Sequence, residues 1–290
     1  MIIPKRYMKL QLFNNNKKNK IVFANWDITN KVVFNTSDSV TGGYNEASIT
    51  MTGLSPDIMG YIASTSTQWL RSAQDNTIII DAGYEDKHNI LFSGTIVEAK
   101  PNIDTANYSL QIKAQTGFFQ MINDVKSYSF PGTKKASEIA NTFAKDLGFV
   151  FVNSLTKDVD VTDFACQDKP IVQCVRYLAQ VTGLDVYISN NRLYIKESGK
   201  ALKQSTVPTF IVDSSNMIGS PKMTPQGIEV NILMNPAVIS GQQVEIKSER
   251  FDTISSQKYT LQSCSHAGDT RGTDWMTHLI LIREDLYGVQ

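Results

Sequence analysis

Two histidines and two aspartates near the C-terminus are the residues best suited to chemistry. His266 and Asp269 lie in a Gly-containing turn, and Asp274 and His278 enter the next strand-like segment, where alternate residues share a face. Imidazole and carboxylate groups bind zinc and related metals, but this spacing matches no zinc site and no facial triad. We therefore expect a polar, hydrogen-bonded turn. The alternative is a metal-dependent hydrolase or another enzyme centred on His266 and His278.

Other catalytic and phosphate-binding motifs are absent from the sequence. Ser265 precedes His266, but no nucleophile elbow or paired base accompanies it. Gly42 and Gly43 belong to neither GxxxxGK nor GxGxxG. We expect no catalytic residue, no cofactor-binding residue and no metal ligand, and we expect that the chain is not an enzyme.

The composition is that of an ordinary globular protein, with 41% hydrophobic and 19% charged residues over 290 positions. No apolar run reaches the roughly 20 residues that span a bilayer, and the N-terminus lacks a secretory signal. Synthesis in the cytoplasm, without membrane attachment, follows as an expectation. The three cysteines, Cys166, Cys174 and Cys264, show no CxxC spacing, so we expect them to be reduced and partly buried.

Positive charge is concentrated at the N-terminus, although the formal net charge of the chain is zero. The first twenty residues contain no acidic residue and six basic ones: Lys5, Arg6, Lys9, Lys17, Lys18 and Lys20. Few aromatic residues accompany them, so a solvated basic hairpin is favoured over a phosphate site. The remaining residues carry a balancing negative excess.

Period-2 hydrophobic patterns predict that the first part of the chain is mainly β-structure. Residues 77–84, 90–99 and 108–114 form a predicted meander, in which Gly94 indicates a bulge or tight bend. Earlier strands are predicted near residues 7–12, 21–23, 31–34 and 45–52. A short helix is predicted from Pro56 to about Ala63, with Ser55 as its N-cap.

From about residue 130 the apolar residues recur at the 3.6-residue spacing of a helix instead of at every second position. Ala136, Ile139, Ala140, Phe143, Ala144 and Leu147 form one apolar stripe that Gly148 ends. A second helix is predicted with Asp168 as N-cap, Pro170 in its first turn and Gly183 at its end, followed by a hairpin around residues 189–191. Strands return near 209–213, 228–232, 243–247, 258–265 and 274–283. The predicted fold is therefore mainly β with an α/β insert.

Several short segments resemble sequence motifs of the baseplate hub proteins of contractile-tailed phages. That group includes late-control D proteins, Mu-type hubs and type VI spike bases. The segments are residues 47–55, 83–85 with 90–96, 168–170 with 193–195, and 259–261 through 266–275. The resemblance covers about residues 5–285 and supplies no catalytic residue. It implies two similar tube-type β-barrel domains, at 1–120 and 205–290, that flank a two-helix α/β module at 121–204.

The resemblance also implies a function in the virion. The chain would be a structural hub in the tail baseplate, forming a homotrimeric, pseudo-hexameric ring between the hexameric tail tube protein and the trimeric central spike protein. Other baseplate proteins, and the tape-measure protein, are further expected partners. DNA would pass through the channel without specific binding, and the negative excess beyond residue 20 predicts a polar, weakly anionic channel.

Overall fold

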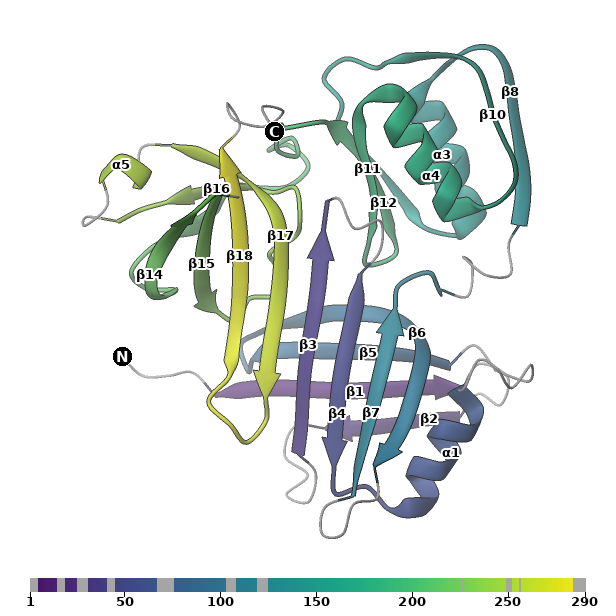
Figure 1. The fold of residues 1–290 in the computed structure, drawn as a ribbon. Helices are drawn as coiled ribbons and strands as arrows, with labels where there is room; N and C mark the ends of the chain where they lie inside the picture. The colour runs from purple at the N-terminus through teal and green to yellow at the C-terminus, as the bar shows by residue number, and fades with distance from the viewer. Residues whose placement is uncertain are drawn as a thin grey trace.

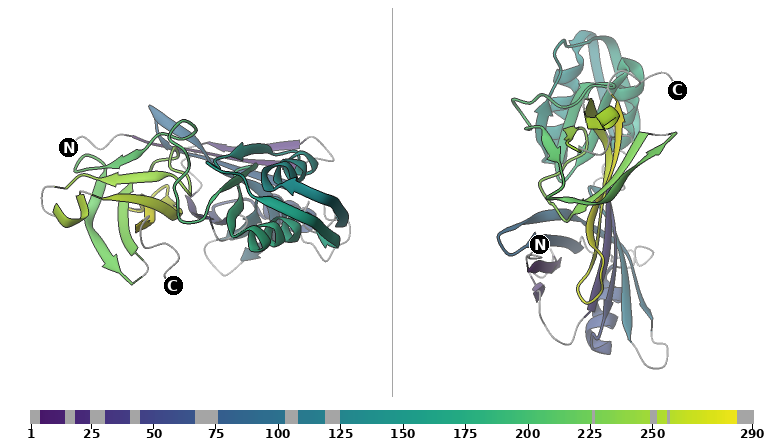
Figure 2. Two further views of the ribbon diagram at one scale, coloured as in Figure 1. Left: turned by 90° about the horizontal axis from the view of Figure 1, so that it is seen from above. Right: turned by 90° about the vertical axis from the view of Figure 1, so that its left-hand side faces the viewer.

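The computed structural model describes residues 5–14, 19–24, 31–40, 45–66, 76–102, 108–118, 125–225, 227–248, 252–255 and 257–283. Over these ranges the chain is mainly β-structure with a few helices, as predicted (Figure 1). Its elements form three consecutive groups, which we call the N-terminal β region, the α/β module and the C-terminal β region. The module and the C-terminal β region lie side by side above the N-terminal β region in Figure 1, and the view from above agrees (Figure 2).

The N-terminal β region begins the chain and contains the predicted meander. Its elements are β1 (Arg6–Asn14), β2 (Asn19–Ala24), β3 (Lys31–Ser39), β4 (Glu46–Thr52), α1 (Pro56–Ser66), β5 (Asn76–Tyr84), β6 (Lys87–Asn102) and β7 (Ser109–Gln115). β3, β4 and β7 bury every second side chain, because alternate residues of a strand face opposite sides of the sheet. Helix α1 starts at Pro56 as predicted and continues to Ser66 rather than ending near Ala63.

The α/β module comprises β8 (Val125–Lys135), α3 (Ala136–Leu147), β9 (Val150–Asn153), β10 (Asp160–Pro170), α4 (Ile171–Thr182), β11 (Leu184–Ser189) and β12 (Arg192–Glu197). The predicted first helix is confirmed at both ends, and Gly148 ends it in the left-handed conformation, with φ of 69°. The predicted hairpin is β11–β12, and Asn190 and Asn191 both have positive φ in its turn. The paired strands β8 and β10 were not predicted.

Two predictions inside the module are wrong. Asp168 does not cap the second helix: it lies in an irregular stretch of β10 with φ of 48°, and its carboxylate accepts a hydrogen bond from Ser127. Pro170 holds the N-cap position without a side-chain hydrogen bond. Cys166 and Cys174 are joined by a disulfide between β10 and α4 instead of being reduced, because the fold brings the two buried side chains together. Cys264 is free and buried, as expected.

The C-terminal β region contains β13 (Phe210–Val212), β14 (Met217–Thr224), β15 (Gly227–Leu233), β16 (Gln243–Ile246), α5 (Asp252–Ser255), β17 (Lys258–Asp269) and β18 (Trp275–Arg283). The predicted pairing of 243–247 with 258–265 is confirmed as β16–β17. The strand β14, which contains Gly219 and Pro221, was not predicted.

The two β regions share one 13-stranded sheet. Its main path runs β14–β15–β18–β17–β3–β4–β7–β6–β5–β1–β2, and β17 pairs antiparallel with β3 across the boundary (Figure 1). The strand pairs between described residues do not close into a barrel on either side of that boundary.

The two regions repeat one strand order across the shared boundary. β3, β4, β6 and β7 lie in the order β6–β7–β4–β3, and β14, β15, β17 and β18 lie in the order β17–β18–β15–β14. In both sets the third strand along the chain comes first, followed by the fourth, second and first. Every neighbouring pair is antiparallel. The same arrangement of two hairpins therefore occurs twice in the chain.

Each group has its own apolar core, and a fourth small cluster lies between groups. The N-terminal core also includes Met234 and Trp275 from the C-terminal β region. The module core surrounds α3 and α4, and the C-terminal core lies under β15–β18. The small cluster joins Val40, Tyr187, Tyr194 and Leu202, so it connects the end of β3 to the module.

Candidate functional site

The hairpin β17–β18 carries all four residues that the sequence nominates for chemistry, but it separates them. His266 pairs with Thr277 and His278 pairs with Ser265 on adjacent strands. Because neighbouring positions along a strand face opposite sides, the two imidazoles lie on opposite faces of the sheet. No group of three or more histidine, cysteine, aspartate or glutamate side chains lies close enough for metal binding within the described ranges. The metal-dependent hydrolase therefore has no support in this geometry.

Both histidines have local partners. Nδ1 of buried His266 lies 2.8 Å from Thr277 Oγ1, and burial lowers the pKa of His266 to about 4. Nδ1 of His278 lies 2.7 Å from Asn231 Oδ1 on β15. The third histidine, His88, lies in β6. It stacks on Tyr7 with ring centroids 3.7 Å apart, and its Nδ1 is 2.9 Å from Asp81 Oδ1.

Asp269 organises the turn between β17 and β18. Its Oδ1 accepts a hydrogen bond from the Arg271 N–H at 2.9 Å, and its Oδ2 lies 2.9 Å from Lys31 Nζ on β3. Partial burial raises the pKa of Asp269, but the hydrogen bonds and the Lys31 charge outweigh it, so the pKa is lowered overall. A carboxylate held ionised by these contacts is suited to fixing a turn.

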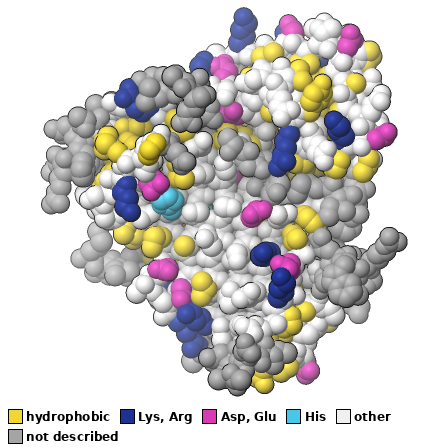
Figure 3. All heavy atoms as spheres, in the orientation of Figure 1, with side chains coloured by type: hydrophobic (Ala, Val, Ile, Leu, Met, Phe, Trp, Pro, Cys, Tyr) yellow, Lys and Arg dark blue, Asp and Glu magenta, His cyan; other side chains and the backbone are white. Residues whose placement is uncertain are grey.

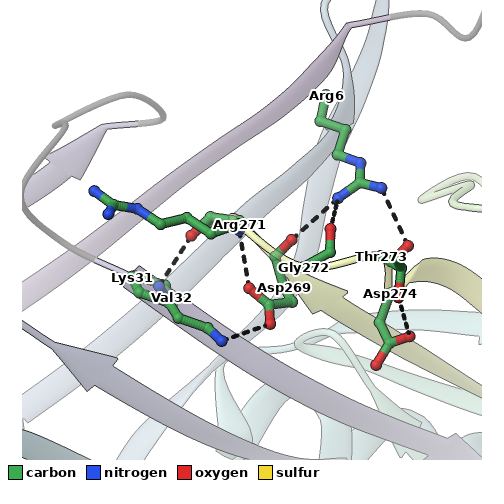
Figure 4. A network of polar contacts seen from close by, with 9 residues as sticks. Arg6, Lys31, Val32, Asp269, Arg271, Gly272, Thr273 and Asp274 are labelled. Carbon is green, nitrogen blue, oxygen red and sulfur yellow. Dashed lines mark hydrogen bonds and ion pairs between the residues drawn. The ribbon is translucent and has the colours of Figure 1, made fainter.

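Arg6 clamps the same turn from β1 (Figure 4). Its Nη1 donates to the carbonyl oxygens of Asp269 at 3.2 Å and Gly272 at 2.7 Å, and its Nη2 donates to that of Thr273 at 3.1 Å. The planar guanidinium suits this arrangement because its N–H groups form a fixed fork. The turn of the C-terminal β region is thereby bound to the first strand of the N-terminal β region.

Trp275 anchors the hairpin inside the N-terminal core. Its indole Nε1 donates to the Gly83 carbonyl at 2.9 Å, and its ring meets Phe34 edge-on with centroids 5.7 Å apart. Gly268 lies beside this pair: a Cβ there would come within 2.4 Å of Phe34 and 3.0 Å of Trp275. Glycine is therefore required for β17 to approach β3 over these rings.

The N-terminal basic residues do not act as one solvated group. The Arg6 guanidinium is hydrogen-bonded to the β17–β18 turn, and Lys5 forms an exposed ion pair with Glu85. Lys17 and Lys18 lie outside the described residues, and the side chain of Lys20 lies outside them too. The predicted basic hairpin, β1–β2, is confirmed as a pair of strands.

The exposed face of the shared sheet is polar (Figure 3). On β3, β4 and β7 it presents mainly serine, threonine, asparagine and glutamine, with Lys113 and Glu46 among them. Ion pairs offset most of its charges, including Lys31–Asp269 at 2.9 Å and Lys100–Glu98 at 2.6 Å.

A groove of about 410 Å³ crosses this region and is lined by Asn35, Thr36, Ser37, Glu46, Ala47, Ser48, Val97, Lys113, Ala114 and Gln115.

The site is thus an interface within the chain, and its central contacts were missed from the sequence. The sequence of residues 266–275 marks a recognisable segment, but nothing in it indicates that the segment joins two regions. Arg6 was grouped with neighbouring lysines, and nothing local pairs it with a turn more than 260 residues away. The one available signal was the presence of Gly268 and Trp275 on either side of a polar turn.

Comparison with known proteins gives a match to one protein family and matches in fold to several solved structures. A scan against protein families matches the family described as Baseplate hub gp41 over residues 22–279. A search of curated protein sequences gave no match.

Solved structures with this fold include three with low sequence identity. The prophage MuSo2 43 kDa tail protein from Shewanella oneidensis superposes with a TM-score of 0.62 at 11% identity, covering 97% of this chain and 99% of that one. A tail protein from Neisseria meningitidis MC58 gives 0.63 at 9% identity, with 97% of each chain covered. The E. coli c3393 protein, a type VI secretion component, gives 0.57 at 7% identity over 87% of this chain and 73% of that chain.

Proposed function

The chain belongs to the baseplate hub gp41 family, and we propose that three copies of it form a ring that connects the tail tube of a contractile phage to its central spike. The observation that carries this proposal is the repeated strand order of the two β regions within one continuous sheet. Two similar units per chain make six units per trimer. Such a ring presents approximate six-fold symmetry to a hexameric tube and three-fold symmetry to a trimeric spike.

The repeat also indicates how the ring would close. Inside one chain, the first strand of one set (β3) pairs with the third strand of the other (β17). If the same pairing of a first strand with a third strand is repeated between chains, β14 of one copy pairs with β6 of the next. Both edges are open within the described residues: β14 pairs only with β15, and beyond Ile96 β6 pairs only with β7. Open strand edges are templates for pairing with another chain.

The exposed polar face of the sheet would line the channel. Its uncharged side chains and offset charges give DNA few sites for tight electrostatic binding, which depends on an excess of positive charge. The α/β module, held at the end of β3, would lie outside the ring. The proposed domain limits remain 1–120, 121–204 and 205–290, supported by the three separate cores.

The proposed partners are the tail tube protein, the central spike protein and other baseplate proteins, with the tape-measure protein as a further candidate. The E. coli type VI protein is structurally similar to the T4 tail proteins gp27 and gp5, and this similarity supports a place beside a spike. No described helix is long and apolar enough to cross a membrane. Membership of this family implies a component of the virion. Synthesis in the host cytoplasm and a purely structural, non-enzymatic role are part of the proposal.

A reconstruction of the tail tip tests the proposal directly. We expect three copies per ring, with β14 of each copy hydrogen-bonded to β6 of the next and the module on the outside. One, two or six copies per ring, or a channel lined by the module, would contradict it. Metal analysis of the purified chain is the accompanying test of the non-enzymatic role, and stoichiometric zinc would count against that role.

A further inference from the structure

The joint between β17 and β3 is held by further contacts at both of its ends. Its ladder runs from the pair Val33–Asp269 to the pair Ser39–Ser263. At the Asp269 end, Arg6 of β1 is hydrogen-bonded to the β17–β18 turn (Figure 4). The Ser39 end lies against the α/β module, at the hairpin β11–β12 (Figure 1).

One face of the hairpin β11–β12 holds the N-terminal β region. Alternate side chains of the two strands enter the module core, and others on the opposite face meet the β regions. On that opposite face, the Ser189 hydroxyl donates to Asp38 Oδ2 at 3.0 Å and accepts from Asn45 Nδ2 at 3.3 Å. Asp38 lies near the end of β3 and Asn45 directly precedes β4, so both belong to the N-terminal β region.

The same face holds the C-terminal β region. The Tyr187 hydroxyl donates to the Ser240 carbonyl oxygen at 2.8 Å, and the Leu202 N–H that follows β12 donates to the Gly241 carbonyl oxygen at 2.7 Å. The rings of Tyr187 and Tyr194 stack with centroids 5.1 Å apart and belong to the small cluster at the end of β3. A Cβ at Gly241 would come within 2.4 Å of the Tyr187 hydroxyl oxygen, so the two segments are in close contact.

A ladder of strands does not by itself fix the angle between the units that it joins. The twist between neighbouring strands ranges from about −10° to −35°, so a short ladder such as β17–β3 permits a range of angles. The module has its own core, and a disulfide between Cys166 and Cys174 joins β10 to α4 within it. A compact unit that contacts both β regions at the far end from Arg6 can restrict that range.

We propose that the α/β module is a brace that fixes the angle between the two β regions of one chain. The consequence for the ring rests on the proposed function. Similar units close into a ring only if every joint turns the sheet by its share of a full circle. The braced face of each module is occupied by its own chain, and the described residues offer no second such face for the joint between β14 and β6. The ring would therefore alternate stiff joints within chains and more compliant joints between them.

The distance between two spin labels, measured by double electron–electron resonance, reads this angle. The labels replace Asp57 of α1 and Ser214 of the turn between β13 and β14, which are both exposed. Attachment through a ketone-bearing amino acid leaves the native cysteines unchanged. Mixing a little labelled chain into excess unlabelled chain restricts the signal to distances within one chain, whatever the oligomeric state. We expect one narrow distance distribution for the chain with an intact module.

Removing the stacked rings should release the brace. Tyr187→Ala with Tyr194→Ala deletes the ring pair and the hydrogen bond to the Ser240 carbonyl, and it leaves the opposite face of the hairpin in the module core. We expect the distance distribution to widen. Tyr177→Ala is the matched control, because it removes a ring that is 39% exposed on α4 and should keep the narrow distribution. An unchanged distribution in the double variant, or equal widening in the control, would overturn the proposal.

A milder variant guards against loss of the module fold. Tyr187→Phe with Ser189→Ala keeps both rings and removes only the hydroxyls that bond to the two β regions. Hydrogen exchange within α3 shows whether the module stays folded in each variant. With α3 still protected, the milder variant should also widen the distribution, and a distribution as narrow as that of the wild type would contradict the brace.

The consequence for the ring has a separate test. Among the particle classes of a tail-tip reconstruction, the angle between the β regions of one chain should vary less than the angle between neighbouring chains. Equal variation at the two kinds of joint would refute the alternation. A ring with a different number of copies would refute the proposed function, whereas the spin-label result within one chain would still decide the brace.

Discussion

Two buried titratable residues, His266 and Asp38, give this chain opposite responses to pH. The folded pKa of His266 is about 4, below its ordinary value of 6.5, so the unfolded chain binds its proton more readily. The stability that depends on neutral His266 is therefore present above pH 6.5 and is lost as the pH falls toward 4. The raised pKa of Asp38 acts in the other direction, since its contribution is lost as the pH rises.

Replacing His266 should isolate the first effect. We expect His266→Gln to flatten the stability profile between about pH 6.5 and 4, where the wild-type unfolding constant gains about tenfold per pH unit of acidification. Urea unfolding of both chains across this range is the measurement. His278→Gln, on the opposite face and only partly buried, is the control and should retain the wild-type slope.

Arg6 should contribute measurably to stability through the turn that it clamps. Arg6→Ala removes hydrogen bonds from a charged donor to three carbonyls and should lower the free energy of unfolding by about 1.5–3 kcal/mol. Arg6→Lys should restore only part of this loss, because an ammonium lacks the planar fork. Full recovery with lysine would show that charge alone matters; Lys100→Ala, at an exposed ion pair, should change stability little.

At the scale of elements, the joint between β17 and β3 depends on one small residue. Gly268→Ala places a Cβ 2.4 Å from Phe34, so we expect the overpacked joint to lose roughly 1–3 kcal/mol of stability. Thermal unfolding measures this loss. In Gly60→Ala nothing lies within 4 Å of the new Cβ in α1, so that control should be neutral or stabilised by about 1 kcal/mol. Equal effects at the two sites would refute the close-approach argument.

Local patterns predicted some elements well and others not at all. The stripe of α3 and the alternation of β4 and β7 were readable because each buries one continuous face against a core. β8 and β14 were missed because their burial is weak and their sequences contain proline and glycine. Asp168 has the residue type of a helix cap, but its pairing with Ser127 places it in a strand irregularity.

For the candidate site, the sequence predicts the hairpin but not its contacts with the N-terminal β region. The contacts that define it join residues from opposite ends of the chain, and no periodicity encodes such pairs. The polar identity of His266 suggested chemistry, whereas its burial against Thr277 gives it a packing role. Resemblance to a family identified the protein class more surely than any motif.

At the scale of the whole molecule, assembly should depend on the open edge of β14. Met223 lies on this strand with 72% of its surface exposed, an unusual position for a large apolar side chain. If β14 meets another copy, Met223→Asp should weaken the trimer and its incorporation into tails. Val150→Asp changes an apolar residue that is 62% exposed on the module, so it should leave assembly unchanged. Analytical ultracentrifugation and tail reconstitution compare them; identical behaviour would argue against β14 as the contact.

The pairing of β17 with β3 also decides how the chain bears mechanical load. Along the covalent backbone the α/β module lies between the two β regions, so a pulling force would seem to pass through it. The direct ladder from Ser39–Ser263 to Val33–Asp269 provides a shorter route, and in it the hydrogen bonds share the load. A force between the two β regions can therefore pass through the β17–β3 hydrogen bonds without passing through the module. A longer or shorter tether on either side of the module would leave this ladder between the two β regions unchanged.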